Sequence, residues 1–394
     1  MMAIPITDNV GATSSPQQAK VPERNAASHQ QPAWPHRVSF LLLLVLVLPA
    51  CTSTARLMEE LAVGYDMPAE ILTPIAHAGI DDQRQKFANL FCAVLEEMDE
   101  FDEWGPCEKY WRTTATDVPP LGEISKDYRV LVISGIFAQC VSSRLTAFSN
   151  GLTRLREIHG LDADDLEVTA FGSSAQNGRT IAQHLKDSNT PQDRRPFIVV
   201  AFSKGAPDLF EGIVNDPEAR EMVAAVITVA GAMGGSPAVD LLQDGIIPSL
   251  VAYFGGDSEC DFGDQGGFDS LFRQNRHRFI ADNDWPIVPS YSIVGVVDFT
   301  NTSLINRPTW QLLALYAKEN DGQLLAYESI VPRGTFLGAA NADHWALAMP
   351  FDTLQDDELE RTFISHNEFP REAMLEAAVR FVIADLEGNQ PVGR

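Results

Sequence analysis

The segment "FIVVAFSKGAPD", residues 197–208, joins two local patterns at a serine. Its first half is apolar and rich in β-branched side chains, which predicts a buried strand. Residues 206–216 carry apolar side chains at helical spacing and predict a helix. Ser203 lies at the turn between them. Its neighbours Ala201 and Gly205 are small, so the strand and the helix can pass close to the turn.

The same alternation of strand and helix extends along much of the chain. Strands are predicted at residues 128–135, 166–172, 197–202, 223–231 and 290–297, and helices at 145–160, 178–187, 206–216, 309–319 and 371–387. Continuous β-branched runs separated by amphipathic helices indicate an α/β fold. We therefore expect a mostly parallel sheet with helices on both of its faces.

The rhythm is interrupted once. Residues 232–285 contain no clear strand and include a stretch rich in Gly and Asp, which is typical of a cap or lid insertion. The Gly/Asp-rich stretch and the apolar residues near 246–254 are together expected to form a lid over an acyl pocket. Four aspartates of the insertion do not have the spacing of a calcium-binding loop, so a solvated acidic loop is favoured over a calcium site. These aspartates are Asp257, Asp261, Asp264 and Asp269.

Three further segments resemble the loops of a known family. They are "VAGAMGGSPAVD" (229–240), "ENDGQLLAYES" (319–329) and "GAANADHWALAMPF" (338–351). Together with the serine turn they resemble the α/β-hydrolase superfamily, and bacterial lipases and esterases most of all. The resemblance covers about residues 128–351. It implies an α/β-hydrolase fold and serine hydrolase chemistry on carboxylic esters.

The resemblance implies a role for three residues in the chain order that is typical of this fold. Ser203 is the expected nucleophile, His344 the base that activates it, and Asp321 the acid that orients the histidine. Asp298, just past the last predicted strand, is the rival acid. Asp343 is too close to His344 in sequence to orient its ring easily.

The oxyanion of such a reaction needs two converging backbone N–H groups. Lys204, next after the serine, is expected to supply one of them. The loop "SGIFAQC" (134–140) is expected to supply the other, from Ile136 or, as second choice, Phe137. The side chain of Lys204 is predicted to face solvent. No dinucleotide fingerprint, phosphate-binding loop or cluster of Cys and His is present, so neither a cofactor nor a metal is expected.

Composition limits the partners. The chain has 394 residues, of which 29 are basic and 54 acidic, and its formal net charge is −25. Such a charge argues against binding to nucleic acid and against electrostatic attraction to anionic membranes. The expected partner is a small-molecule or lipid ester, and the oligomeric state is left open.

The N-terminal segment reads as an export signal. A disordered stretch, residues 1–36, precedes the apolar run 40–48, which is shorter than the about 20 residues that span a bilayer. The run ends in Leu-Pro-Ala before Cys51, which resembles the lipobox of bacterial lipoproteins. This resemblance implies lipidation of Cys51 and anchoring in the cell envelope, and Thr52 after it favours the outer membrane. A plain signal peptide or a single N-terminal anchor is the alternative.

Export also predicts disulfides, because four further cysteines would face an oxidising compartment. We favour pairing of Cys92 with Cys107 and of Cys140 with Cys260, although four cysteines allow three pairings. The expected organisation is a disordered N-terminus with signal (1–50), a helical extension (51–127) and a hydrolase domain (128–394).

The favoured function is that of an exported, lipid-anchored serine hydrolase that cleaves carboxylic esters through an acyl-enzyme. A thioesterase, amidase or polyester depolymerase on the same fold is the first alternative. A non-catalytic surface lipoprotein is the second, and the presence of candidates for all three roles at Ser203, Asp321 and His344 argues against it.

Overall fold

A computed structural model describes residues 79–98, 101–136, 146–242, 263–264, 266–350 and 368–388. All of them lie in one compact unit, Glu59–Arg394. The strands are β1 (Asp81–Asp82), β2 (Arg129–Ile133), β3 (Asp162–Leu166), β4 (Phe197–Phe202), β5 (Val223–Val229), β6 (Ser290–Gly295) and β7 (Thr335–Ala340). They form one parallel sheet in the order β1-β7-β6-β5-β4-β2-β3, so the expected α/β architecture is confirmed.

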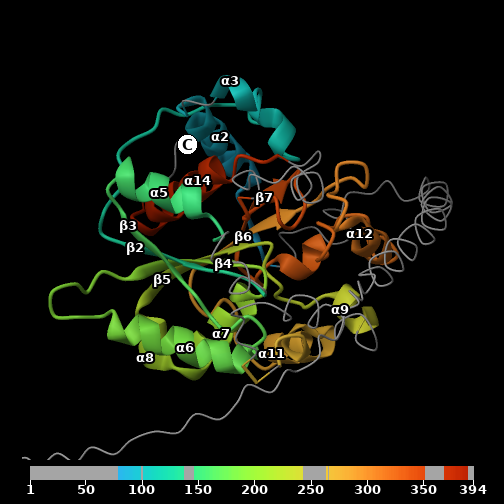
Figure 1. The fold of residues 1–394 in the computed structure, drawn as a ribbon. Helices are drawn as coiled ribbons and strands as arrows, with labels where there is room; N and C mark the ends of the chain where they lie inside the picture. The colour runs from blue at the N-terminus through green and yellow to red at the C-terminus, as the bar shows by residue number, and fades with distance from the viewer. Residues whose placement is uncertain are drawn as a thin grey trace, which may run out of the picture. The chain divides into compact units, whose positions relative to one another are not determined.

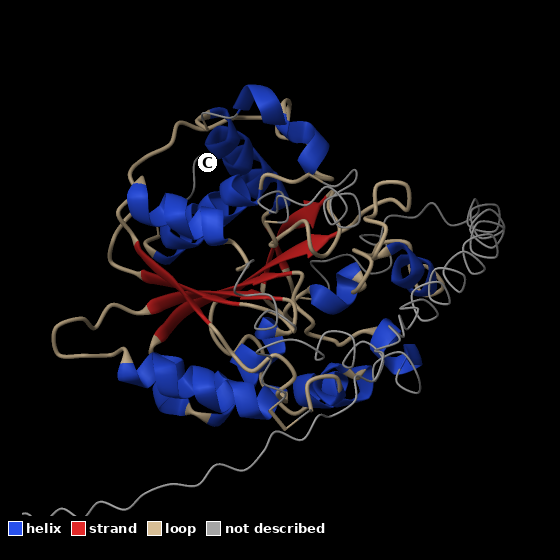
Figure 2. Cartoon of the chain, viewed as in Figure 1, coloured by secondary structure: helices blue, strands red, loops and turns tan. Residues whose placement is uncertain are grey.

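Helices cover both faces of this sheet (Figures 1 and 2). On one face lie α2 (Arg84–Glu96), α5 (Ser149–Glu157) and α14 (Arg371–Leu386), and on the other α6 (Ser174–Asp187), α7 (Gly205–Asn215), α8 (Pro217–Glu221) and α11 (Arg273–Ala281). The shorter elements are α3 (Phe101–Trp104), η3 (Cys107–Tyr110), α9 (Pro237–Leu242), η4 (Asp269–Leu271), α12 (Arg307–Leu313) and η5 (Ala326–Ser329).

Strand β4 contributes side chains to the apolar cores on both faces of the sheet. Ile198, Val200 and Phe202 belong to the apolar core beneath α2, α5 and α14. Val199 and Ala201 belong to the core beneath α6 and α7. Successive side chains of a strand point to opposite faces, so a continuous apolar run is what a doubly covered central strand needs.

The predicted strand 166–172 is wrong by several residues. The strand is β3, whose register with β2 begins at Asp162. Because β3 lies at the edge of the sheet, several of its side chains face solvent and can be aspartates. These aspartates hide the apolar pattern by which a strand is predicted. The apolar residues that were assigned to a strand are buried in the loop that follows, where Phe171 accepts a hydrogen bond from the Gly267 N–H and packs on Phe268.

Strand β7 was not predicted, because it ends in small residues instead of β-branched ones. Its Gly338 has φ +153°, and a Cβ there would lie 3.0 Å from the ring of Trp111.

The helix predicted at 309–319 is shorter than expected: α12 ends at Leu313. Within the insertion, the described residues form the helices α9, η4 and α11 and no strand, in line with the expectation of no clear strand there. Residues 243–262, which include the apolar stretch 246–254, lie outside the described part.

The described part of the N-terminal extension packs into the same core as the sheet. Strand β1 pairs with β7, and α2 packs on β7 and α14 through buried residues such as Phe87 and Phe91. The extension is therefore structurally continuous with the residues beyond 127. Cys92 of α2 and Cys107 of η3 form the favoured disulfide, with Cα atoms 5.4 Å apart. Cys51, Cys140 and Cys260 lie outside the described residues.

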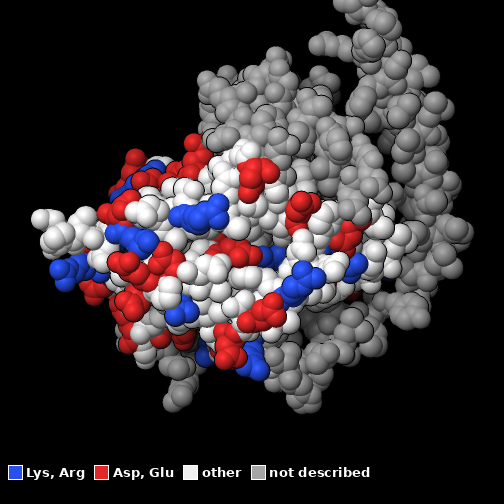
Figure 3. Space-filling view, turned by 90° about the horizontal axis from the view of Figure 1, so that it is seen from below, with Lys and Arg blue, Asp and Glu red and all other residues white. Residues whose placement is uncertain are grey.

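Charged side chains of both signs are interspersed on the face seen in Figure 3, where α6 and α8 meet solvent. No helix among the described residues is long and apolar enough to cross a membrane.

Candidate active site

Ser203 occupies the turn between β4 and α7 in a left-handed backbone conformation, with φ +54°. Few residues other than glycine adopt this conformation, because the Cβ crowds the backbone. Backbone hydrogen bonds hold it: the Ser203 N–H donates to Val229 O (3.1 Å), and the Ala232 N–H donates to Ser203 O (3.0 Å). The turn is therefore fixed to the next strand and to the loop that follows it.

Two glycines bring the neighbouring loop against this turn. A Cβ on Gly205 would lie 2.5 Å from the carbonyl oxygen of Ile133, at the end of β2. A Cβ on Gly135 would lie 2.7 Å from the Cβ of Ser203. The small residue two positions after the serine thus serves the close approach that the sequence pattern predicted. The loop after β2 passes directly beside the serine.

His344 links the serine to a carboxylate. Its Nε2 lies 2.8 Å from Ser203 Oγ, and its Nδ1 lies 2.7 Å from Asp321 Oδ2. The His344 N–H also donates to the main-chain oxygen of Asp321 (2.8 Å), so the two loops are joined twice. The Phe202 ring lies 5.0 Å from the imidazole, centre to centre. Ser203 is 8 % exposed and the other two residues of this chain of hydrogen bonds are 1 % exposed.

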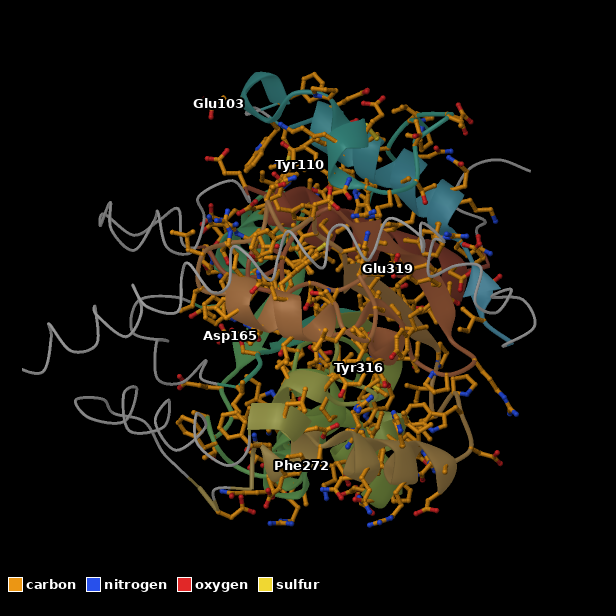
Figure 4. The ribbon with its side chains drawn as sticks, turned by 90° about the vertical axis from the view of Figure 1, so that its right-hand side faces the viewer. Glu103, Tyr110, Asp165, Phe272, Tyr316 and Glu319 are labelled. Carbon is orange, nitrogen blue, oxygen red and sulfur yellow. A yellow bond between two sulfur atoms is a disulfide. The ribbon has the colours of Figure 1, made fainter. Side chains whose placement is uncertain are left out.

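Asp321 is held by its own turn. Its Oδ1 accepts hydrogen bonds from the N–H groups of Gln323 (2.8 Å) and Leu324 (2.7 Å), which leaves Oδ2 for the histidine. Gly322 has φ +89°, which is the left-handed region that favours glycine. The strong turn signal of Asn-Asp-Gly and the acid role are thus compatible at one residue. This turn can be found in Figure 4 by the label of Glu319, two residues before Asp321, which stands lower than Tyr110 and higher than Phe272.

The rival acid Asp298 and the neighbouring Asp343 have partners other than the His344 ring. Asp298 is exposed and forms an ion pair with Arg112 (3.4 Å). Asp343 is buried and accepts hydrogen bonds from the N–H groups of Ser303 (2.9 Å) and Ala346 (3.1 Å). Burial raises the pKa of Asp343, and hydrogen bonds from Ser303 and Ala346 oppose the rise.

The expected oxyanion donors border the serine. Lys204 is the N-cap residue of α7, at the helix end where backbone N–H groups and the helix dipole favour negative charge. Ile136 follows Gly135, the residue in close contact with the serine. Phe137, the second choice, lies outside the described residues.

The prediction that the Lys204 side chain faces solvent is wrong. It is 1 % exposed, and its Nζ lies 2.7 and 2.8 Å from the two carboxylate oxygens of Asp208, one helical turn further on. The signal that could have revealed this is the i, i+4 spacing of Lys and Asp on a helix whose other faces are apolar.

Apolar side chains from four other places in the chain gather beside the candidate donor Ile136. This cluster contains Ile136, Ala232, Val239, Leu271 and Leu324. Ala232 and Leu324 are also the residues whose N–H groups bond to Ser203 and to Asp321. The sequence does not reveal this cluster, because its members come from loops and from the short helices α9 and η4, which lie far apart in the chain and share no periodicity. Within the described residues, no group of three or more His, Cys, Asp or Glu side chains is arranged to hold a metal ion.

Comparison with known proteins adds relatives of known structure. No family model and no curated protein matches the chain. Its structure is similar to the crystal structure of the metagenomic carboxyl esterase MGS0156, with 31% sequence identity and a TM-score of 0.71 over 82% of this chain and 98% of that one. It also matches the mature Bacillus licheniformis lipase BlEst2, with 19% identity and a TM-score of 0.46 over 58% of this chain and 89% of that one. A third match is the Paleococcus ferrophilus monoacylglycerol lipase, with 14% identity and a TM-score of 0.37 over 67% and 96% of the two chains.

Proposed function

Because the chain belongs to the α/β-hydrolase superfamily and resembles a carboxyl esterase over most of its length, we propose that it is a serine hydrolase of carboxylic esters. The observation that carries the proposal is the hydrogen-bonded chain from Ser203 Oγ through His344 to Asp321, built on a serine with positive φ. Nucleophile, base and orienting acid at hydrogen-bond distance are the arrangement that acyl transfer requires.

In the first half of the reaction, Ser203 Oγ attacks the ester carbonyl carbon while His344 Nε2 accepts the hydroxyl proton. Asp321 stabilises the imidazolium that forms and keeps its ring in place. The carbonyl oxygen becomes an oxyanion, for which the N–H groups of Lys204 and Ile136 are the proposed donors. His344 then gives its proton to the leaving alkoxide, and the acyl group remains on Ser203.

In the second half, His344 takes a proton from water, and the resulting nucleophile attacks the acyl-enzyme carbonyl. The acid product leaves, and Ser203 regains its proton from the histidine. No cofactor takes part in this sequence.

The direct test is hydrolysis of p-nitrophenyl esters of short and long acyl chains by the wild type and by Ser203→Ala. We expect turnover to fall to the level of buffer in the variant. Ser188→Ala, at the far end of α6, is the matched control and should leave turnover unchanged. Turnover that survives in Ser203→Ala would refute the proposal. Matched thioesters and amides in the same assay distinguish the substrate classes.

The cellular location is a separate proposal that rests on the sequence alone. Cys51 after Leu-Pro-Ala supports export and lipid anchoring in the cell envelope, on the outer membrane. Metabolic labelling with a fatty-acid probe tests it: the wild type should carry the label and Cys51→Ser should not. Equal labelling of the two proteins would refute the anchor.

A further inference from the structure

A buried ion pair joins Lys204 to Asp208 and starts next to the candidate nucleophile in the chain. Lys204 is the residue after Ser203, and both members of the pair are 1 % exposed. The ammonium is shared between the two carboxylate oxygens at 2.7 and 2.8 Å. The side chain of Lys204 is thereby fixed at its far end, one turn along α7.

Asp208 is in turn held by the first turn of a second helix. Ser174 Oγ donates to its Oδ1 (2.6 Å), and Asn177 Nδ2 donates to its Oδ2 (2.8 Å). Both donors belong to α6 and are almost fully buried. The carboxylate therefore has donors on both oxygens from two helices, which fixes its position more firmly than a single pair would.

The start of α6 is itself attached to the inserted segment. The Ser174 N–H donates to Ser270 Oγ (2.8 Å), and Ser173 donates through its N–H and its hydroxyl to Asp264 (2.6 and 2.5 Å). Burial alone would raise the pKa of Asp264, but the hydrogen bonds from Ser173 and the charge of Lys204 lower it. A continuous polar network thus runs from the insertion to the residue beside Ser203.

Stability alone does not require such a pair. Burying two charges costs several kcal/mol in lost hydration, and apolar residues of the same volume are often as stable or more so. The pair lies instead where precision has a chemical use, because the peptide between Ser203 and Lys204 carries a proposed oxyanion donor. A displacement of about 1 Å at such a group is enough to reduce the rate strongly.

We propose that Lys204 and Asp208 are positioning residues: their ion pair holds the Ser203–Lys204 peptide so that the Lys204 N–H points at the developing oxyanion. This inference rests on the proposed function, because it presupposes acyl transfer at Ser203. The side chains act through the backbone and do not touch the substrate.

The test compares Lys204→Met and Asp208→Asn with the wild type, using the full chain and enzyme concentrations from the burst of active-site titration. We expect kcat to fall about 10- to 100-fold, because loss of a whole oxyanion donor costs about 10²–10³-fold. KM should change little, since the donor acts on charge that develops in the transition state. The affinity for a trifluoromethyl ketone, which forms a tetrahedral oxyanion on the serine, should fall by the same factor as kcat.

Glu376→Gln is the matched control. Glu376 is also 1 % exposed and paired with arginines, but it lies on α14, on the other face of the sheet. The Glu376→Gln substitution should lower the melting temperature, and it should leave kcat and ketone affinity per titrated site unchanged. Ser174→Ala, which removes one donor from Asp208 and keeps both charges, should give a smaller loss in the same two quantities and serves if either charge variant does not fold.

Two results would overturn the proposal. Variants with lower melting temperature but wild-type kcat and ketone affinity would make the pair purely structural. A rise in KM with unchanged kcat would place its effect in substrate binding. Activity that persists in Ser203→Ala would instead refute the proposed function, so the two failures are distinguishable.

Discussion

At the scale of single residues, the site depends on backbone conformations that only a few positions tolerate. Ser203 holds a positive φ, which costs on the order of 1–3 kcal/mol for a residue other than glycine. The hydrogen bonds of its main chain to Val229 and Ala232 maintain this conformation. The Cβ-free surfaces of Gly135 and Gly205 allow the β2 loop to lie against it.

Asp321→Asn tests the acid assignment. An amide in this position can donate to the imidazole nitrogen and so favour the wrong tautomer, which prevents His344 from accepting the serine proton. We expect kcat/KM for an ester to fall about 10³–10⁴-fold at neutral pH while the protein remains folded. Steady-state kinetics with circular dichroism measures both. Asp298→Asn is the matched control, and an equal loss in that variant would contradict the assignment.

Gly205→Ala tests the close packing behind the serine. The added Cβ would meet the main-chain oxygens of Ile133 and Ser134 at 2.5 and 2.8 Å, so the end of β2 or the loop after it would have to shift. We expect a loss of about 1–3 kcal/mol in the free energy of unfolding, together with loss of activity because the loop carrying Ile136 moves. Denaturant unfolding gives the first quantity. Gly122→Ala, where no atom lies within 4 Å of the added Cβ, should be neutral; similar losses in both variants would rule out this explanation.

At the scale of secondary-structure elements, the helices on the two faces of the sheet contact their neighbours in different ways. The α6–α7 face uses very close helix contact, since a Cβ on Gly212 would lie 2.5 Å from the main-chain oxygen of Gly178. The opposite face uses a charged link between α5 and α14. There, Glu376 accepts hydrogen bonds from Arg154 (2.5 Å) and Arg380 (2.7 Å).

This link makes part of the stability depend on pH. Burial alone would raise the pKa of Glu376, but the charge of Arg154 and the hydrogen bonds from Arg380 and Arg154 lower it below the ordinary 4.5. A depressed carboxyl pKa contributes stability above its unfolded value, and that contribution is lost as the pH falls through the folded value. His159 Nε2, 3.0 Å from the same carboxylate, adds to the attraction when protonated.

We therefore expect Glu376→Gln to lower the free energy of unfolding by about 2 kcal/mol near neutral pH. The difference from wild type should shrink as the pH falls below 4.5, because the Glu376 carboxyl takes up a proton first in the unfolded chain and only at lower pH in the folded protein. Thermal unfolding at a series of pH values measures it, with exposed Glu157→Gln as control. A difference that is constant down to acidic pH would contradict the charge-based explanation.

The Cys92–Cys107 disulfide joins α2 to η3 across a separation of 15 residues. A loop of that length predicts about 3 kcal/mol of stabilisation through the unfolded chain. Cys92→Ser/Cys107→Ser should lose about that amount in denaturant unfolding, with catalytic constants unchanged because α2 lies on the sheet face away from Ser203's helix α7. An unchanged midpoint would show that the bond contributes nothing to stability.

At the scale of the whole molecule, the strands with β-branched runs were predictable from sequence, whereas the other strands and the contacts between distant loops were not. β-Branched runs marked β2, β4, β5 and β6, because buried parallel strands need apolar side chains on both faces. Strand β7, made of small residues, and the two-residue strand β1 carry no such pattern. The edge strand β3 was predicted several residues too late. Its own sequence is rich in aspartate and does not resemble a strand, whereas the apolar loop after it does.

The candidate site divides in the same way. Three short motifs pointed to Ser203, Asp321 and His344, since each role needs a specific chemical group at a specific turn, and the structure brings these three side chains together. The buried Lys204 and the apolar cluster around Ile136 depend on which residues distant in sequence become neighbours. Local patterns carry no such information, so a charged residue beside a turn was expected to face water.

The assignment of Ser203 as the nucleophile is tested most directly by covalent labelling of the protein. We would treat the full chain with a fluorophosphonate, digest it and identify the modified residue by mass spectrometry. We expect a single adduct on Ser203, formed rapidly in the wild type and not detectably in His344→Ala. An adduct on another residue, or rapid ester turnover with Ser203 unmodified, would contradict it.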